Sequence, residues 1–186
     1  MNNQQTEAFA LKLVKAESST ESTQILADHG YWDEDAAWLP IGGRENNNGI
    51  IANQSAKPEF SIVELVTNAM DACSLRACHA AGIDPESNSA PKTVFDAAES
   101  FFDVPAGGNL STMSAAEKSK LAKNIGLVAT GSKINPNIVI FDKGIGQPAS
   151  RFPSTLCSLG ESNKARVQFS YGAYNQGGSG SLTHCA

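Results

Sequence analysis

Three oxygen-bearing side chains stand at helical spacing in the segment ELVTNAMDA, residues 64–72. Glu64, Asn68 and Asp71 are separated by four and then three positions, so one face of a helix presents all three. The positions between them are mostly apolar, which predicts that the rest of this helix is largely buried. A stripe of acid and amide oxygens on such a helix suits a hydrated divalent cation carrying phosphates, because Mg²⁺ takes oxygen ligands and keeps several waters.

A second polar site is expected where a short apolar run ends. Residues 137–141 read NIVIF, and this apolar, partly β-branched run predicts a central strand. The strand leads to Asp142, and Gly144 and Gly146 follow it closely. Glycines let a ligand approach the backbone, so a base-sized ligand would have room to reach the Asp142 carboxylate.

Two later segments add groups that suit phosphate. Residues 159–164, LGESNK, place small residues before the basic Lys164. Gly177, Gly178 and Gly180 follow in the segment YGAYNQGGSGSL and predict a turn that runs into the start of a helix. The free backbone N–H groups and the dipole of such a helix start favour an anion.

In this order the four segments resemble the N-box, the first glycine box, the lid segment and the second glycine box of the GHKL ATPases, the superfamily of gyrase, heat-shock chaperone, histidine kinase and MutL. The similarity covers residues 48–182. Stretches such as NNNGIIANQSAKPEFSI, GLVATGSK and FPSTLCSLG are also similar to large, poorly characterised bacterial ATP-binding proteins with such a domain near the N-terminus. The resemblance implies a Bergerat-type α/β (α+β) two-layer sandwich, in which helices cover one face of a mixed, mainly antiparallel sheet.

The resemblance also implies ATP and Mg²⁺ as the ligands, with a role for each matching residue. Glu64 matches the general base that activates the attacking water. Asn68 matches the Mg²⁺ ligand that bridges the phosphates, and Asp71 would support Asn68 or lie near the nucleotide. Asp142 matches the carboxylate that receives the adenine amino group. The other nucleotide contacts that the resemblance implies are Gly144, Gly146, Lys164, Gly177, Gly178 and Gly180.

Hydrolysis of ATP is the reaction that we expect, with conformational change or dimerisation of a larger protein as its output. A glutamate opens the N-box, and His29 lies in no evident paired-helix segment of the kind that precedes the ATPase domain in histidine kinases. Two alternatives stay open: a nucleotide-sensing module that does not hydrolyse ATP, and an inactive truncated remnant. Ser61 and Glu64 also have the spacing of a capping box, which would give Glu64 a purely structural role.

Composition limits the classes of function. The chain of 186 residues is long enough for one domain with a substantial core. Its net charge of −5, from 14 basic and 19 acidic residues, gives no overall basic footprint for nucleic acid. No apolar run approaches the length of a membrane span, and the N-terminal MNNQQTEAF lacks the features of a signal peptide, so we expect a cytoplasmic protein.

The cysteines and histidines do not have the spacing of a metal site. No C-x-x-C pair occurs, and the two cysteines of the N-box helix stand five positions apart. We expect reduced, partly buried thiols. The four cysteines are Cys73, Cys78, Cys157 and Cys185, and the three histidines, which have no ligand spacing with them, are His29, His79 and His184.

The order of elements predicts a helical N-terminal extension over 1–47 and an ATP-binding domain over 48–186. Pro58 is placed to begin the N-box helix and Gly82 to end it. Residues 83–134 form a mainly helical insertion in this interpretation. Because several strands follow the second glycine box in the superfamily fold, and this chain ends soon after that box, we expect a partial domain whose C-terminal strands are missing. Further expected elements are helices over 6–16, 20–29, 89–102 and 114–123 and a loop over 46–49.

Overall fold

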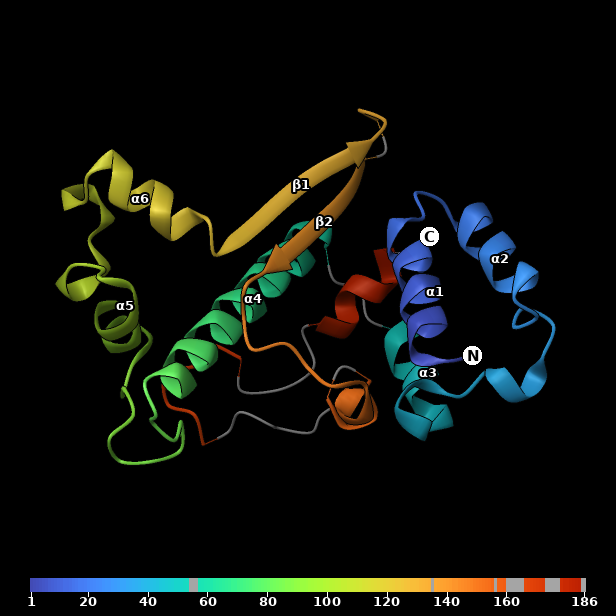
Figure 1. Ribbon diagram of the computed structural model, residues 1–186, viewed down its shortest axis with the longest axis horizontal. Coiled ribbons are helices and arrows are strands. Elements are labelled where there is room, and N and C mark those ends of the chain that lie inside the picture. The colour runs from blue at the N-terminus through green and yellow to red at the C-terminus, as the bar shows by residue number, and fades with distance from the viewer. Residues whose placement is uncertain (54–56, 135, 156, 160–165, 173–177, 185–186) are drawn as a thin grey trace.

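The computed structural model describes residues 1–186 apart from 54–56, 135, 156, 160–165, 173–177 and 185–186. Helices dominate, and the described residues add a hairpin of two antiparallel strands, so the fold is of the α+β class (Figure 1). The α-helices are α1 (Asn3–Lys15), α2 (Ser19–Asp28), α3 (Glu45–Ala52), α4 (Pro58–Ala80), α5 (Val94–Phe102) and α6 (Ala115–Ala122). The strands are β1 (Ile125–Gly131) and β2 (Pro136–Asp142). Short 3-10 helices are η1 (Asp35–Ala37), η2 (Ile41–Gly43), η3 (Ala106–Gly108), η4 (Leu110–Thr112), η5 (Ala149–Ser154) and η6 (Gly178–His184).

The long helix α4 begins and ends where its sequence predicts. Pro58 occupies the first turn, where a missing backbone N–H costs no hydrogen bond. Just beyond the helix, Gly82 has a left-handed conformation with φ +71° and donates its N–H to the carbonyl of His79 at 2.9 Å. A larger residue would be strained in that conformation, so the glycine sets the end of the helix.

The hairpin of β1 and β2 pairs Val128 with Val139 at its centre. The expected strand over 137–141 is confirmed and lies within β2. The prediction of a mainly helical insertion over 83–134 did not anticipate β1, where Leu127 and Val128 pair across to β2 instead of extending α6. The earlier part of that segment does contain the helices α5 and α6.

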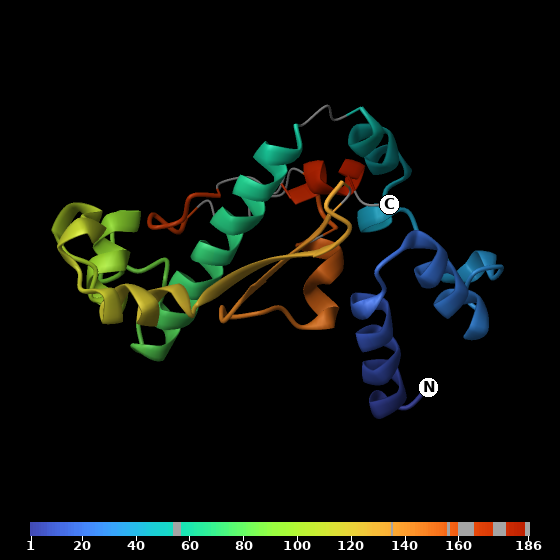
Figure 2. The ribbon, with the colours of Figure 1, turned by 90° about the horizontal axis from the view of Figure 1, so that it is seen from above.

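The hairpin, α5 and η6 lie around α4 (Figures 1 and 2). The hairpin contacts α4 mainly through β2, while η6 packs against both α4 and α3. α5 contacts α4 towards its C-terminal end, and α1 and α2 lie at the opposite side of the molecule (Figure 1). α4 is therefore the element on which the later segments of the chain are assembled.

A small apolar core lies beside the C-terminal half of α4. Phe169 is 1% exposed, and its ring meets that of Phe101 edge-on with the centroids 6.4 Å apart. Residues from α4, from α5 and from the segment before the second glycine box thus share one core. Its buried members are Cys78, Ala90, Ala97 and Phe169, and Leu75, Ile83, Phe101 and Val167 pack against them.

Part of α4 and much of the hairpin leave apolar side chains exposed. The expectation of a largely buried N-box helix is wrong for Val63 and Met70, which are 62% and 39% exposed. On the hairpin, Leu127, Val128 and Val139 are each about half exposed, although they come from both faces of the sheet. The reason is that, in the described part of the chain, a two-stranded sheet covers only a portion of a 23-residue helix.

The N-terminal segments follow their predicted order with one exception. The helices expected over 6–16 and 20–29 are confirmed as α1 and α2. The loop expected over 46–49 is wrong, since α3 runs through it. The contacts of α3 are not visible in the local pattern: the buried side chain of Asn47 donates to the Ile41 carbonyl at 2.8 Å, and η6 packs against the helix.

Side-chain caps start α5 and α6. Ser114 and Glu117 form the predicted capping box of α6, in which Glu117 accepts the backbone N–H of Ser114 at 2.7 Å. α5 begins at Val94, later than the expected start at Ser89, because the hydroxyl of Thr93 supplies its N-cap. The caps thus set where both helices begin.

We predict that Phe169→Ala destabilises the fold by about 3–5 kcal/mol, because it removes a fully buried ring and leaves a cavity between α4 and α5. Phe60→Ala is the matched control: Phe60 is 64% exposed, and its loss is expected to cost less than about 1 kcal/mol. Urea unfolding followed by circular dichroism measures both variants. Equal unfolding midpoints would contradict this core.

Candidate functional site

The polar stripe lies on one face of α4, as its spacing predicts. Glu64 and Asn68 are half-buried, and the side-chain amide of Asn68 donates to Glu64 Oε1 at 3.3 Å. This contact joins successive turns of the helix. It keeps the carboxylate and the amide side by side on the face that Asp71 also occupies.

The capping-box alternative for Glu64 is wrong. α4 starts at Pro58 with Lys57 as its N-cap residue, so Ser61 and Glu64 lie inside the helix. The Ser61 hydroxyl is buried and has no hydrogen-bond partner among the described residues, whereas a capping box would have given it one. Glu64 therefore has no role in starting the helix.

Asp71 binds the segment that leads into the second glycine box. It is 2% exposed, and its Oδ2 accepts from the hydroxyl of Ser170 at 2.7 Å and from the N–H of Gly172 at 3.1 Å. Its Oδ1 accepts from the N–H of Tyr171 at 2.9 Å. Hydrogen bonds to an ionised carboxylate are roughly twice as strong as neutral ones. Asp71 thus fastens residues 170–172 to α4, an arrangement that we name the Asp71 clamp, while its contact with a nucleotide stays a prediction.

The loop after β2 lies against α4 next to this clamp. Ile145 donates its N–H to the carbonyl of Ala72 at 3.1 Å. Asp142 is exposed, and its Oδ1 accepts the N–H of Gly144 at 2.7 Å, which closes a tight turn. Within the described residues no donor is bound to its other oxygen. That oxygen is therefore available to a ligand.

Glycine is required at position 144 and favoured at position 146 for different physical reasons. A Cβ on Gly144 would collide with the Cβ and the carbonyl carbon of Ala72, so this glycine permits the close approach of the loop to α4. Gly146 has φ +65° with open space around it, so its backbone conformation is what favours glycine. The first glycine box thus packs directly on the N-box helix.

Two glycines of the second glycine box lie in η6. η6, a 3-10 helix, covers Gly178–His184, and Gly180 is buried. The turn expected before it includes residues outside the described part of the chain, so the expected helix start stays a prediction. Figure 2 shows η6 between α4 and α3, and it contacts both. Gly177 and Lys164 lie outside the described residues, so their roles stay predictions.

Three motifs that are distant in the sequence therefore meet on α4. Asp71 and Tyr171 are 100 residues apart. Ala72 contacts the first glycine box through Ile145, and η6 adds the second glycine box. This arrangement gathers carboxylate, amide and backbone groups of all three motifs around one helix.

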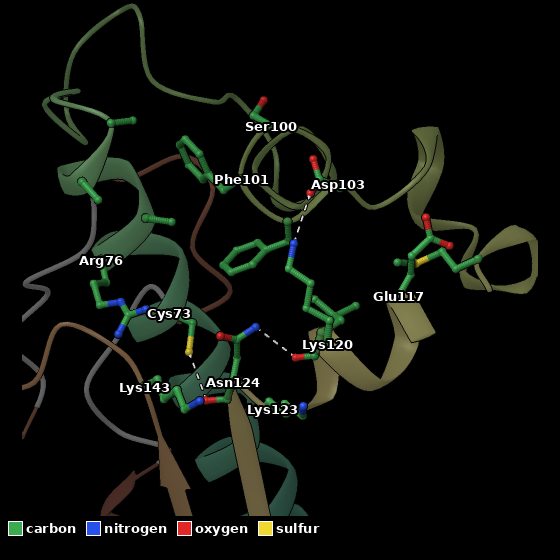
Figure 3. Close-up of a pocket in the computed structure, with 16 residues that line it drawn as sticks. Cys73, Arg76, Ser100, Phe101, Asp103, Glu117, Lys120, Lys123, Asn124 and Lys143 are labelled. Carbon is green, nitrogen blue, oxygen red and sulfur yellow. Dashed lines mark hydrogen bonds and ion pairs between the residues drawn. The ribbon is translucent and has the colours of Figure 1, made fainter. Parts of the chain in front are cut away.

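A cavity of about 880 Å³ lies on the other side of α4, between this helix, α5 and α6 (Figure 3). A helix has about 3.6 residues per turn, so Cys73 and Ala77, which line the cavity, face away from Glu64 and Asn68. None of the described residues predicted to bind nucleotide lines it. Its basic residues come from α4, from α6 and its C-cap, and from the residue after β2, so no sequence motif unites them. They are Arg76, Lys120, Lys123 and Lys143.

In the described part of the chain, no group of three or more His, Cys, Asp or Glu side chains is placed to hold a metal ion. Cys73, Cys78 and Cys157 are free thiols, and Cys185 lies outside the described residues. Burial raises the pKa of Cys73, whose thiol donates to a backbone carbonyl at 3.6 Å. Mg²⁺ at Asn68 needs no such cluster, because this cation keeps several waters and binds phosphates.

Comparison of the chain with protein-family models, with curated proteins and with solved structures finds no match. Within the described ranges, none of the helices combines the length and the apolar character needed to cross a bilayer. The case for a function therefore rests on the residues of this chain and on their arrangement around α4.

We predict that Asp71→Asn lowers the free energy of unfolding by about 3 kcal/mol. Whichever way the new amide turns, its NH₂ group meets a backbone N–H of residues 170–172, so buried hydrogen bonds are lost. Asp142→Asn is the control, because Asp142 is exposed and accepts one local hydrogen bond, and its expected cost is about 1 kcal/mol or less. Urea unfolding gives the stabilities, and amide hydrogen exchange at Tyr171 and Gly172 reports the clamp. Unchanged exchange at these two amides would contradict it.

Proposed function

We propose that this chain is an ATP-binding domain of the GHKL type with a Bergerat-type fold, and that it hydrolyses ATP with Mg²⁺ as cofactor. The observation that carries the proposal is the meeting of three motifs on α4, through the Asp71 clamp, through Ala72 with Ile145, and through η6. The order of the motifs is a property of the sequence alone. Their convergence on one helix is a separate, spatial observation that supports the same function.

Asp142 would bind the adenine end of the nucleotide. The N–H of Gly144 engages Oδ1, so the turn fixes the direction of the carboxylate, and the second oxygen keeps its capacity to accept from an amino group. The side chain is exposed, as an acceptor for an incoming base must be. Gly144 holds this turn against α4 and so fixes the adenine contact relative to the N-box.

Asn68 and the second glycine box would serve the phosphate end. One amide oxygen, together with phosphate oxygens and waters, is a donor set that Mg²⁺ accepts. When bound, Mg²⁺ would neutralise phosphate charge and orient the reacting group. Gly178 and Gly180 would offer backbone N–H groups to the phosphates. Lys164 and Gly177 complete the proposed set.

Glu64 would act as the general base. Asn68 donates to its Oε1, which orients the side chain, and Oε2 would take the proton. The oxygen of a water would bond to the γ-phosphorus while the bond from that phosphorus to the bridging oxygen of the β-phosphate breaks. The proton of the water would pass to Glu64, and ADP and phosphate would leave. A positioned general base contributes about 10²–10⁴-fold to such a rate.

We predict that ATP with Mg²⁺ raises the melting temperature of the chain, since a ligand at about a hundred times its Kd stabilises a folded protein by about 2.7 kcal/mol. Asp142→Asn should reduce this shift, because its amide can present donors to the adenine amino group, which is itself a donor. Asp33→Asn, which changes an exposed carboxylate outside the motifs, is the control and should keep the full shift. Scanning fluorimetry measures all three proteins. A parent chain that shows no shift would contradict the proposal.

We predict that Glu64→Gln keeps the affinity for ATP within a few-fold of the parent and lowers the hydrolysis rate by about 10²–10⁴-fold. The glutamine keeps the shape of the side chain and an acceptor for Asn68, but it does not take a proton. Glu59→Gln, an exposed glutamate in the first turn of the same helix, is the matched control and should retain parental turnover. Phosphate release measures hydrolysis, and calorimetry measures binding. ATP binding without turnover in the parent, or parental turnover in Glu64→Gln, would favour the nucleotide-sensing alternative or another base.

A further inference from the structure

The cavity between α4, α5 and α6 has the size of a small-molecule site (Figure 3). Its volume is about 880 Å³, and pockets for small ligands typically span about 300–1,000 Å³. It lies on the side of α4 opposite the stripe of Glu64 and Asn68, so it is separate from the proposed nucleotide site. We name it the cationic cavity after its basic lining residues, which are Arg76, Lys120, Lys123 and Lys143.

The acidic side chains of the cationic cavity already have partners. Asp103 lies 4.0 Å from Lys120 Nζ. Glu117 caps α6, since its Oε2 accepts from the hydroxyl and from the N–H of Ser114, both at 2.7 Å. These two hydrogen bonds hold the pKa of Glu117 below its usual value, and the hydrogen bond from the hydroxyl has the larger effect. Both acids keep their negative charge, so the lining carries two carboxylates against four basic side chains, an excess of two positive charges.

Three cations of the cavity have no such partner. Among the described residues, no carboxylate forms an ion pair with Arg76, Lys123 or Lys143. Figure 3 shows Arg76 and Lys143 on the side of α4 and Lys123 beside the end of α6. An anion that enters this cavity would therefore be attracted by several cations of its lining.

The uncharged part of the lining of the cationic cavity, which we name the floor, is mostly apolar. Cys73 contributes a neutral thiol, because burial raises its pKa. The side-chain amide of Asn124 donates to the carbonyl of Leu121 at 3.0 Å, so this donor is already satisfied. An apolar body would therefore be favoured on the floor and an anionic group at the basic residues. The apolar lining residues are Ala77, Ala80, Ala81, Phe101, Phe102, Met113 and Leu121.

We propose that the cationic cavity binds a small organic phosphate, with its phosphate among Arg76, Lys123 and Lys143 and an apolar or aromatic body over the floor. A phosphomonoester carries about −1.5 to −2 charges at pH 7 and three acceptor oxygens, so it engages several cations at once. The guanidinium of Arg76 is able to bind two of those oxygens. A monocarboxylate has less charge and fewer oxygens for the same three cations. The proposal does not rest on ATP binding, because the two sites share no residue.

Titration with phenyl phosphate, followed by heteronuclear NMR of the backbone amides, tests the place and the chemistry of this site. We expect saturable shifts at cavity residues, among them Asn124 and Lys143. Inorganic phosphate and phenol should each bind at least about five-fold more weakly, because inorganic phosphate lacks the aromatic ring and phenol lacks the phosphate. Shifts confined to the hairpin or to the face of Glu64, equal binding of phenol, or no shift at millimolar phenyl phosphate would each overturn the proposal.

Charge removal tests the basic residues individually. Arg76→Gln and Lys123→Gln change exposed side chains. Each should lower the affinity for phenyl phosphate about five-fold or more at low salt, and each should reduce the salt dependence of that affinity. Lys12→Gln removes the same charge on α1, at the far side of the molecule, and should bind as the parent does (Figure 1). Arg76→Gln should also keep the ATP-dependent melting shift of the parent. Parental affinity in both cavity variants, an equal loss in Lys12→Gln, or loss of the ATP shift in Arg76→Gln would overturn a separate phosphate site.

Discussion

A buried carboxylate holds the C-terminal part of this molecule to its central helix. Removal of a charge from water is costly unless hydrogen bonds replace the lost hydration, and Asp71 receives three from residues 170–172. Phe169 precedes that segment, and its ring fills the core beside α4. Adjacent residues thus supply both kinds of attachment: the clamp fixes the direction of the backbone, and the ring contributes apolar burial.

Segments on both sides of residues 173–177 lie against α4. Gly172 belongs to the Asp71 clamp, and η6 contacts α4 and α3. On the neighbouring side of the helix, Gly144 admits the turn after β2 because it has no side chain. The carboxylates of Asp71 and Asp142 therefore differ by environment. The first is buried and accepts hydrogen bonds from residues 170–172, whereas the second is exposed with an oxygen available to a ligand.

Two kinds of chemistry lie on opposite sides of α4. Glu64 and Asn68 present oxygens that suit a cation with phosphates, whereas the cationic cavity presents basic groups that suit an organic anion. The end of the hairpin where β1 begins and β2 ends borders both sides of α4. Lys143 donates its N–H to the Asn124 carbonyl at 2.9 Å, and both residues line the cavity, while Asp142 directly precedes the turn of the first glycine box. A displacement of this end of the hairpin would move part of the cationic cavity together with the turn of the first glycine box.

The sequence by itself determined the features that depend on near neighbours: the stripe of Glu64 and Asn68, the start of α4 at Pro58 and its end at Gly82. These follow from helical spacing and from backbone conformation, which are local properties. Only the tertiary structure decided that Asp71, which continues the same stripe, binds a segment 100 residues away. It also decided that an asparagine-rich stretch forms α3, that β1 pairs with β2, and that basic residues of separate elements surround one cavity. Such contacts depend on which distant segments the chain brings together, and tertiary packing of that kind overrides what any short pattern predicts.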